Sequence, residues 1–162
     1  MAQQTKPKEQ EKQLRENEKK WSKTLMESGF TVFPSVILER QKALGLTPLE
    51  VNILLFLCTF WWTKDGRPRP AIGTIAEAVG RSPRHVTRVI SGLVDLGLIE
   101  RHQRSYKETG NLTNEYSFDG LIKEVMPYAK EKIEEREAKE AAKKAKTAKK
   151  GKPKLRVVKD GD

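Results

Sequence analysis

The fold is decided by IGTIAEAVGRSPRHVTRVIS, residues 72–91. Two successive segments, in this stretch and just after it, each have apolar residues at helical spacing. Each segment therefore predicts a short helix with one buried face. The buried positions are Ile75, Ala76 and Val79 in the first helix, and Val86, Val89, Ile90, Leu93 and Val94 in the second. Between the helices, Gly80 can take a positive φ angle, and Ser82 followed by Pro83 is typical of a helix N-cap. Two short helices joined in this way predict a helix-turn-helix.

The outward face of the second helix carries basic and hydroxyl side chains. They are Arg84, Thr87, Arg88 and Ser91, with His85 at the edge of the face and Arg81 at the start of the helix. Guanidinium groups bind guanine or phosphate in a forked geometry, and no acidic residue precedes Asp95 in this helix. We therefore expect this face to bind double-stranded DNA. The alternative is the ordinary solvated face of an amphipathic helix.

A β-hairpin is predicted after the second helix. Gly97 ends the helix, and residues 99–106 are separated by a turn-rich stretch from residues 114–118, where Tyr116 and Phe118 alternate with polar residues. A hairpin beside a DNA-reading helix, called a wing, usually lies over the DNA backbone. The candidate phosphate contacts on it are Arg101, Arg104 and Lys107. The alternative is a solvated hairpin.

A strongly apolar helix is expected before the helix-turn-helix. Thr47, Pro48 and Glu50 form a capping box that predicts its start. Residues 51–62 are apolar almost throughout, and they are too few to span a bilayer. Their apolar side chains must be covered either by the preceding segment, residues 30–45, or by a second subunit. In the second case the chain would form a homodimer through the Val51–Trp62 helix. Trp61 and Trp62 are expected to be buried at a core or dimer contact.

Two shorter segments flank this apolar helix. Ser35 is expected to cap a short helix that ends at Gly45. Residues 63–70 must turn, and Pro68 and Pro70 limit any strand there to a short edge piece.

This order of elements resembles the winged helix-turn-helix superfamily over residues 30–121. More narrowly, the chain resembles a bacterial helix-turn-helix family found in plasmid and phage replication initiators and in small regulators. The resemblance rests on GFTVFPSVIL (29–38), LTPLEVNILLFL (46–57), the helix-turn-helix itself, LVDLGLIER (93–101) and TNEYSFDGLI (113–122). It implies a mainly α fold with a small β-hairpin, and it implies binding of duplex DNA by Arg84, Thr87, Arg88, Arg101 and Arg104.

Three functions are compatible with this resemblance. The first expectation is a sequence-specific transcriptional regulator, and the alternatives are a replication initiator of a plasmid or phage and a winged-helix module that binds protein. An initiator would occupy repeated sites in an origin, whereas a regulator would occupy a promoter. A protein-binding module would keep its partner after charge reversal at Arg84 and Arg88.

Charge divides the 162 residues into three parts, within a total of 32 basic and 22 acidic residues. Residues 1–20 form a charged arm, either coil or a loose helix, and residues 21–129 form the nearly neutral winged domain. Residues 130–162 form a basic tail with 13 basic and 7 acidic residues. We expect a helix over Leu121–Glu140, fraying beyond it, where Ala141–Arg156 carries eight basic residues and no acidic one. This tail suits either a non-specific DNA clamp or a solvating role.

No motif points to catalysis. The chain has a single cysteine, Cys58, and two histidines, His85 and His102, with no carboxylate spaced to complete a metal site. It has no phosphate-binding glycine loop and no nucleophile elbow. We therefore expect no enzyme activity, metal or cofactor. Because the N-terminus carries no apolar signal, we expect a cytoplasmic protein without membrane contact.

Overall fold

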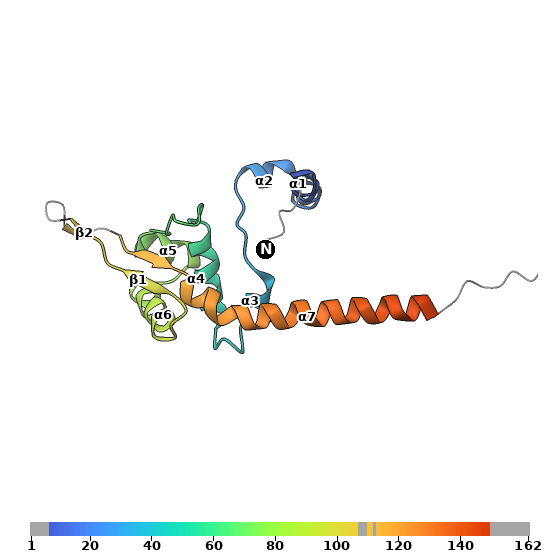
Figure 1. Cartoon of the computed structure of the whole chain (residues 1–162). Coiled ribbons are helices and arrows are strands. Elements are labelled where there is room, and N and C mark those ends of the chain that lie inside the picture. Colours follow the sequence, from blue (N-terminus) through green and yellow to red (C-terminus); the bar gives the residue numbers. More distant parts are fainter. Residues whose placement is uncertain (1–6, 107–109, 112, 150–162) are drawn as a thin grey trace, which may run out of the picture.

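The computed structural model describes residues 7–106, 110–111 and 113–149, and these are mainly helical (Figure 1). An N-terminal arm contains α1 (Pro7–Trp21) and α2 (Lys23–Glu27), so the helical alternative is confirmed for residues 7–20 of the predicted charged arm. Residues 1–6 lie outside the described part of the chain. The body contains α3 (Ser35–Glu39), α4 (Pro48–Cys58), α5 (Ile72–Val79), α6 (Pro83–Asp95), β1 (Glu100–His102), β2 (Ser105–Tyr106), β3 (Gly110–Asn111) and β4 (Glu115–Ser117). The last element, α7 (Asp119–Lys149), starts in the body and leaves it.

The core lies where α4, α5 and α6 meet. Its fully buried side chains are Ile53, Leu54 and Leu57 of α4, Ile75 of α5, and Val86, Ile90 and Leu93 of α6. Val79, Val89 and Val94 pack against this core and are partly buried. The inward faces predicted from the helical period are therefore confirmed. Burying one such aliphatic side chain contributes about 1.5–3 kcal/mol, so this cluster fixes how the three helices pack.

The turn between α5 and α6 is closed on both sides. Gly80 adopts the left-handed conformation with φ 63°, and the backbone N–H of Arg81 donates to the Ala76 carbonyl at 2.9 Å. The Gly80 N–H donates to the Glu77 carbonyl, which completes a Schellman motif. On the other side, the Ser82 hydroxyl accepts from the backbone N–H of His85 at 3.3 Å. Both caps of the predicted helix-turn-helix are thus confirmed.

The helix α4 begins at the predicted capping box but ends earlier than expected. The Thr47 N–H donates to the Glu50 carboxylate at 2.7 Å, and the Glu50 N–H donates back to the Thr47 hydroxyl. The helix stops at Cys58, before the two tryptophans. Trp61 stacks on Phe118 with ring centroids 5.1 Å apart and remains 36% exposed, whereas Trp62 is 80% exposed. Trp62 is therefore not a core residue of this chain.

Two local expectations were wrong. Ser35 is the first residue of α3 and makes no capping hydrogen bond, and α3 stops at Glu39 rather than at Gly45. Residues 63–70 form no strand, because proline lacks the N–H that a ladder needs. The Tyr116 N–H donates to the Pro68 carbonyl at 3.0 Å, which joins this segment to the hairpin.

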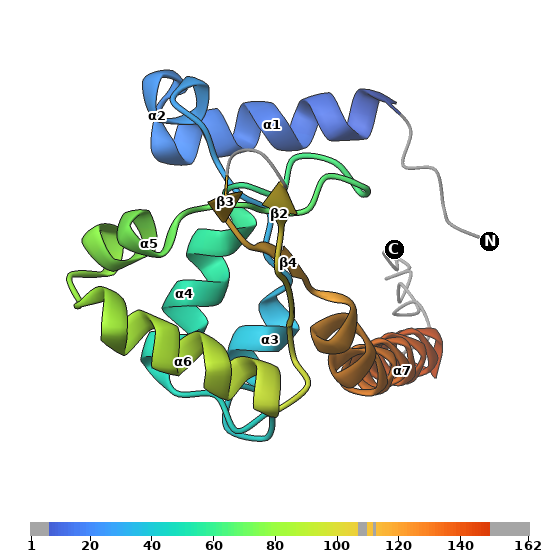
Figure 2. The ribbon, with the colours of Figure 1, turned by 90° about the vertical axis from the view of Figure 1, so that its left-hand side faces the viewer.

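The predicted hairpin is present. Strand β1 pairs antiparallel with β4, with Arg101 opposite Tyr116, and β2 pairs with β3 further along the wing. Tyr116 and Phe118 are buried and hold the base of the hairpin on the core. The fold is therefore a mainly α winged helix-turn-helix. Figure 2 shows that the wing and α6 lie on the same side of the body.

The helix α7 is longer than expected. Leu121 and Val125 are buried against the body, whereas every described residue from 130 to 147 is exposed. Ion pairs from Lys132 to Glu39 at 2.6 Å and from Arg40 to Glu131 at 3.2 Å join α7 to α3 and the residue after it. The helix continues through residues 141–149, so the expected fraying beyond Glu140 is wrong for this segment. Residues 150–162 lie outside the described part of the chain.

We predict that Gly120→Ala destabilises the fold by about 1–3 kcal/mol, the usual range for overpacking. A Cβ atom at Gly120 would collide with the Gly97 carbonyl oxygen, and this close approach accompanies a hydrogen bond from the Leu121 N–H to the Leu98 carbonyl at 2.7 Å. Urea unfolding followed by tryptophan fluorescence measures the change.

Gly73→Ala is the matched control, because a Cβ atom at Gly73 meets nothing within 4 Å. This substitution in a helix is expected to leave stability unchanged or to raise it by about 0.5–1 kcal/mol. Equal unfolding midpoints for the two variants would contradict the close packing of α7 against the end of α6.

Candidate nucleic-acid interface

The helix α6 separates an apolar inner face from a polar outer face. Val86, Ile90 and Leu93 point into the core, and Arg84, Thr87 and Arg88 are exposed on the other side. In Figure 2 the helix lies at the front of the body, and no ribbon crosses over it. Among the described residues, nothing therefore prevents the outer face from entering the groove of a DNA duplex.

Two interactions order the side chains on this face. The Thr87 hydroxyl donates to the Pro83 carbonyl at 2.9 Å, which leaves its oxygen free to accept a further hydrogen bond. The Arg88 Nη2 lies 3.4 Å from the Nδ1 of the half-buried His85, so the imidazole helps to position the guanidinium. Ser91 is half-buried, as His85 is, whereas Arg84, Thr87 and Arg88 are exposed.

The start of α6 suits an anion. Arg81 is exposed in the turn just before the helix, and its own N–H is held by the Schellman bond. A helix N-terminus carries a partial positive charge that favours phosphate. Within the described residues, Arg81, Arg84 and Arg88 form no ion pair, so their charges are not neutralised by the protein.

The arginines of the wing are less free than sequence reasoning suggested. The Arg104 Nε lies 3.3 Å from a carboxylate oxygen of Glu115, and the Arg69 Nε lies 2.9 Å from the same oxygen. Glu115 is only 17% exposed, so it partly neutralises both guanidinium groups. Arg101 is half-buried opposite Tyr116. Lys107 lies outside the described residues.

From the sequence, Arg69 could face either a ligand or only water, and the structure pairs it with Glu115 instead. This contact joins residues far apart in the chain, and no local sequence pattern predicts it. The hydrogen bond between Tyr116 and Pro68 brings the two segments together.

Two titratable side chains of the body have pKa values above their ordinary range. Burial raises the pKa of the Cys58 thiol to about 11, and burial also raises the pKa of the Tyr116 hydroxyl. Among the described residues, no group of three histidine, cysteine or acidic side chains is placed to hold a metal ion. None of the helices within residues 7–149 is both long and apolar enough to cross a membrane.

Comparison with known families assigns most of the chain to one family. The profile of the DnaD N-terminal domain matches residues 33–137. The chain belongs to the DnaD N-terminal domain family. The match covers the whole body and the proximal part of α7, so α6 and the wing belong to the family domain. The arm formed by α1 and α2, and the distal part of α7, lie outside it.

One solved structure shares this fold. The chain is similar to the N-terminal domain of the DnaD protein from Geobacillus kaustophilus HTA426, with 18% identity and a TM-score of 0.51 over 71% of this chain and 93% of that chain. A weaker similarity is to the multiple antibiotic-resistance repressor MarR from Listeria monocytogenes 4b F2365, with 15% identity and a TM-score of 0.35 over 89% of this chain and 99% of that chain. No curated protein sequence matches the chain.

Proposed function

We propose that this protein binds double-stranded DNA by placing α6 in the major groove, with the wing over the adjacent backbone. The observation that carries the proposal is the outer face of α6, which is exposed, basic and free of acidic residues before Asp95. The major groove is wide enough to admit a helix. The proposal is a binding role without a catalytic step.

The contacts divide into base-reading and backbone contacts. Arg84 and Arg88 are the candidates for a forked contact with guanine, and the Thr87 oxygen can accept from a base amino group. Arg81, Arg101 and the partly neutralised Arg104 suit phosphates. The predicted roles of His85 and Ser91 are supporting ones, because both are half-buried.

Removing the charge of α6 is the direct test of DNA binding. We expect Arg88→Ala to weaken binding to a duplex selected from a random library by about 1–3 kcal/mol, the value of one forked base contact. The double variant R84A/R88A should also lose its preference for that duplex over unrelated DNA. Fluorescence anisotropy at several salt concentrations measures both effects.

A matched double variant, R15A/R136A, removes the same charge from the exposed surfaces of α1 and α7. It should keep the sequence preference of the wild type. Unchanged affinity and preference in R84A/R88A would contradict the proposal and would favour a protein-binding module.

We further propose that DNA binding serves replication, in the manner of an initiator of a plasmid or phage. Family membership favours this role, and it gives the transcriptional alternative no specific support. Mapping of the DNA fragments bound in cells tests it. We expect repeated sites clustered in a replication origin, whereas sites confined to promoters would contradict the replication role.

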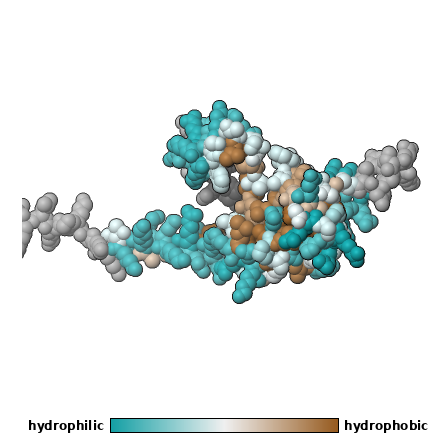
Figure 3. All heavy atoms as spheres, turned by 180° about the vertical axis from the view of Figure 1, so that it is seen from behind, coloured by the Kyte–Doolittle hydropathy of each residue, from teal (hydrophilic) through white to brown (hydrophobic). Residues whose placement is uncertain are grey.

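Residues 51–62, through which a homodimer was one alternative, offer little surface for a second copy. A homodimer would need another surface of the chain. Within α4, Val51, Ile53, Leu54 and Leu57 are buried in their own chain, which leaves little for a partner. Beside it lies an apolar groove of about 190 Å³ between the segment before α3, the end of α4 and the start of α7. Its exposed members are Val32, Pro34, Trp61, Ile122 and Met126. Figure 3 shows apolar surface on the body where α7 begins.

We propose that this groove is the contact between two copies of the chain. Sedimentation of the wild type should then depend on concentration, and Met126→Lys should give a monomer, because the lysine would place a charge in an apolar contact. Ile133→Lys is the control, since Ile133 is similarly exposed on α7 but does not line the groove. A wild type that stays monomeric at high concentration would contradict this contact.

A further inference from the structure

The charge of α7 changes sign along the helix. Residues 119–140 carry five basic and seven acidic residues. Residues 141–149 carry four lysines and no acidic residue. A net negative helix thus ends in a positive segment, which we call the lysine end.

The acidic residues of the proximal part neutralise its cations. Arg136 lies 3.2 Å from Glu140, Lys139 lies 3.6 Å from Glu135, and Lys132 pairs with Glu39. Within the described chain, Lys143, Lys144 and Lys146 have no such partner, and all three are exposed. The lysine end therefore presents uncompensated charge to solvent.

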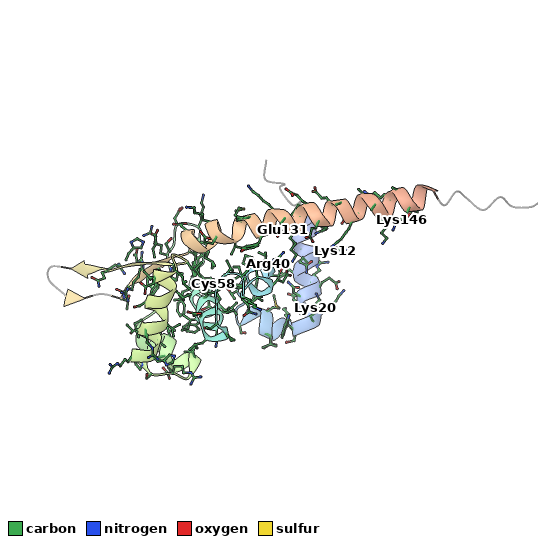
Figure 4. All side chains as sticks on the ribbon, turned by 90° about the horizontal axis from the view of Figure 1, so that it is seen from below. Lys12, Lys20, Arg40, Cys58, Glu131 and Lys146 are labelled. Carbon is green, nitrogen blue, oxygen red and sulfur yellow. The ribbon has the colours of Figure 1, made fainter. Side chains whose placement is uncertain are left out.

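The lysine end lies far from the predicted DNA-binding face. Figure 1 shows α7 leaving the body on the side opposite to the wing, and Figure 4 places Lys146 near the far end of the helix. At a rise of about 1.5 Å per residue, the helix is roughly 46 Å long. A straight duplex in contact with α6 and the wing therefore does not reach the lysine end.

We infer that the lysine end binds the phosphate backbone of a second DNA segment, so that one molecule bridges two duplexes. The bridging rests on the proposed function for the first duplex, whereas phosphate binding by the lysine end does not. Lysine binds phosphate as a point charge and needs no particular base sequence. The second contact is therefore non-specific and sensitive to salt.

The composition of the lysine end favours a phosphate backbone over a membrane surface or a protein interface. Apart from its lysines, residues 141–149 are alanines and Thr147. Insertion into a membrane surface needs large apolar side chains on one face, and a protein interface needs aromatic or arginine anchors. The lysine end has neither. Its lysines also offset the negative end of the helix dipole and so can stabilise the helix. The experiment must separate this structural role from phosphate binding.

The triple variant K143A/K144A/K146A tests the inference in the full chain. Alanine is the best helix former, so circular dichroism should show unchanged helix content. For binding to a random duplex, the slope of log K against log salt should flatten by roughly 0.9 for each phosphate that the protein no longer neutralises. Capture of a free labelled duplex by an immobilised duplex should fall at least severalfold. Sedimentation should show the same oligomeric state as the wild type.

The control variant K12A/K19A/K20A removes three lysines from α1, where Lys19 pairs with Glu16 at 2.6 Å. It should keep the wild-type salt slope and capture. An unchanged slope in the α7 variant, or equal losses in the two variants, would overturn the inference. Loss of capture together with loss of the oligomer would also overturn it, because the oligomer itself would then be the bridge.

The variant R84A/R88A separates this inference from the proposed function. If the proposed function and the inference both hold, R84A/R88A loses its sequence preference and no longer captures the labelled duplex. It keeps the part of the salt slope that the lysine end supplies. If R84A/R88A behaves as wild type while the α7 variant flattens the slope, the proposed function fails and phosphate binding by the lysine end stands. A different outcome would favour a membrane surface and overturn the inference. In it, the wild type binds vesicles of anionic lipid, the α7 variant does not, and the salt slope for DNA is the same for both.

Discussion

The left-handed turn at Gly80 is the constraint on which the rest of the structure depends. It ends α5 through two backbone bonds and sends the chain into α6 at the angle that brings Val86, Ile90 and Leu93 onto the core. Once these three side chains are inside, helical geometry places Arg84, Thr87 and Arg88 outside. A residue with a Cβ atom at φ 63° costs roughly 1–2 kcal/mol, so glycine is favoured there. The orientation of the basic face is thus a consequence of core packing.

Ion pairs neutralise part of the positive charge of the body. Glu115 neutralises part of the charge of Arg69 and Arg104, and Glu39 and Glu131 hold the cations between α3 and α7. Exposed pairs of this kind contribute little to stability. Their larger effect is on the field around the molecule, because the cations on the outer face of α6 and at the lysine end have no such pair among the described residues.

Sequence reasoning predicts the elements that local chemistry specifies. The capping box at Thr47, the caps around Gly80 and the inward faces of α5 and α6 depend on residues a few positions apart, and all are present in the structure. Contacts between distant residues are harder to predict. Neither the stacking of Trp61 on Phe118 nor the shared carboxylate of Glu115 has a local signal. Helix α7 exceeds its predicted length because alanine, lysine and glutamate, which dominate residues 134–149, favour a helix even without a core to pack on.

Family membership and surface chemistry answer different questions about this chain. At 18% identity to a solved DnaD N-terminal domain, the two chains need share only the inward pattern that fixes the fold. The side chains that contact a ligand point outward, and similarity of fold does not determine them. The basic face of α6 lies inside the family domain, whereas the lysine end begins after residue 137, where the match stops. DNA binding that uses both the basic face of α6 and the lysine end therefore depends on charged residues outside the family domain as well as on the family fold.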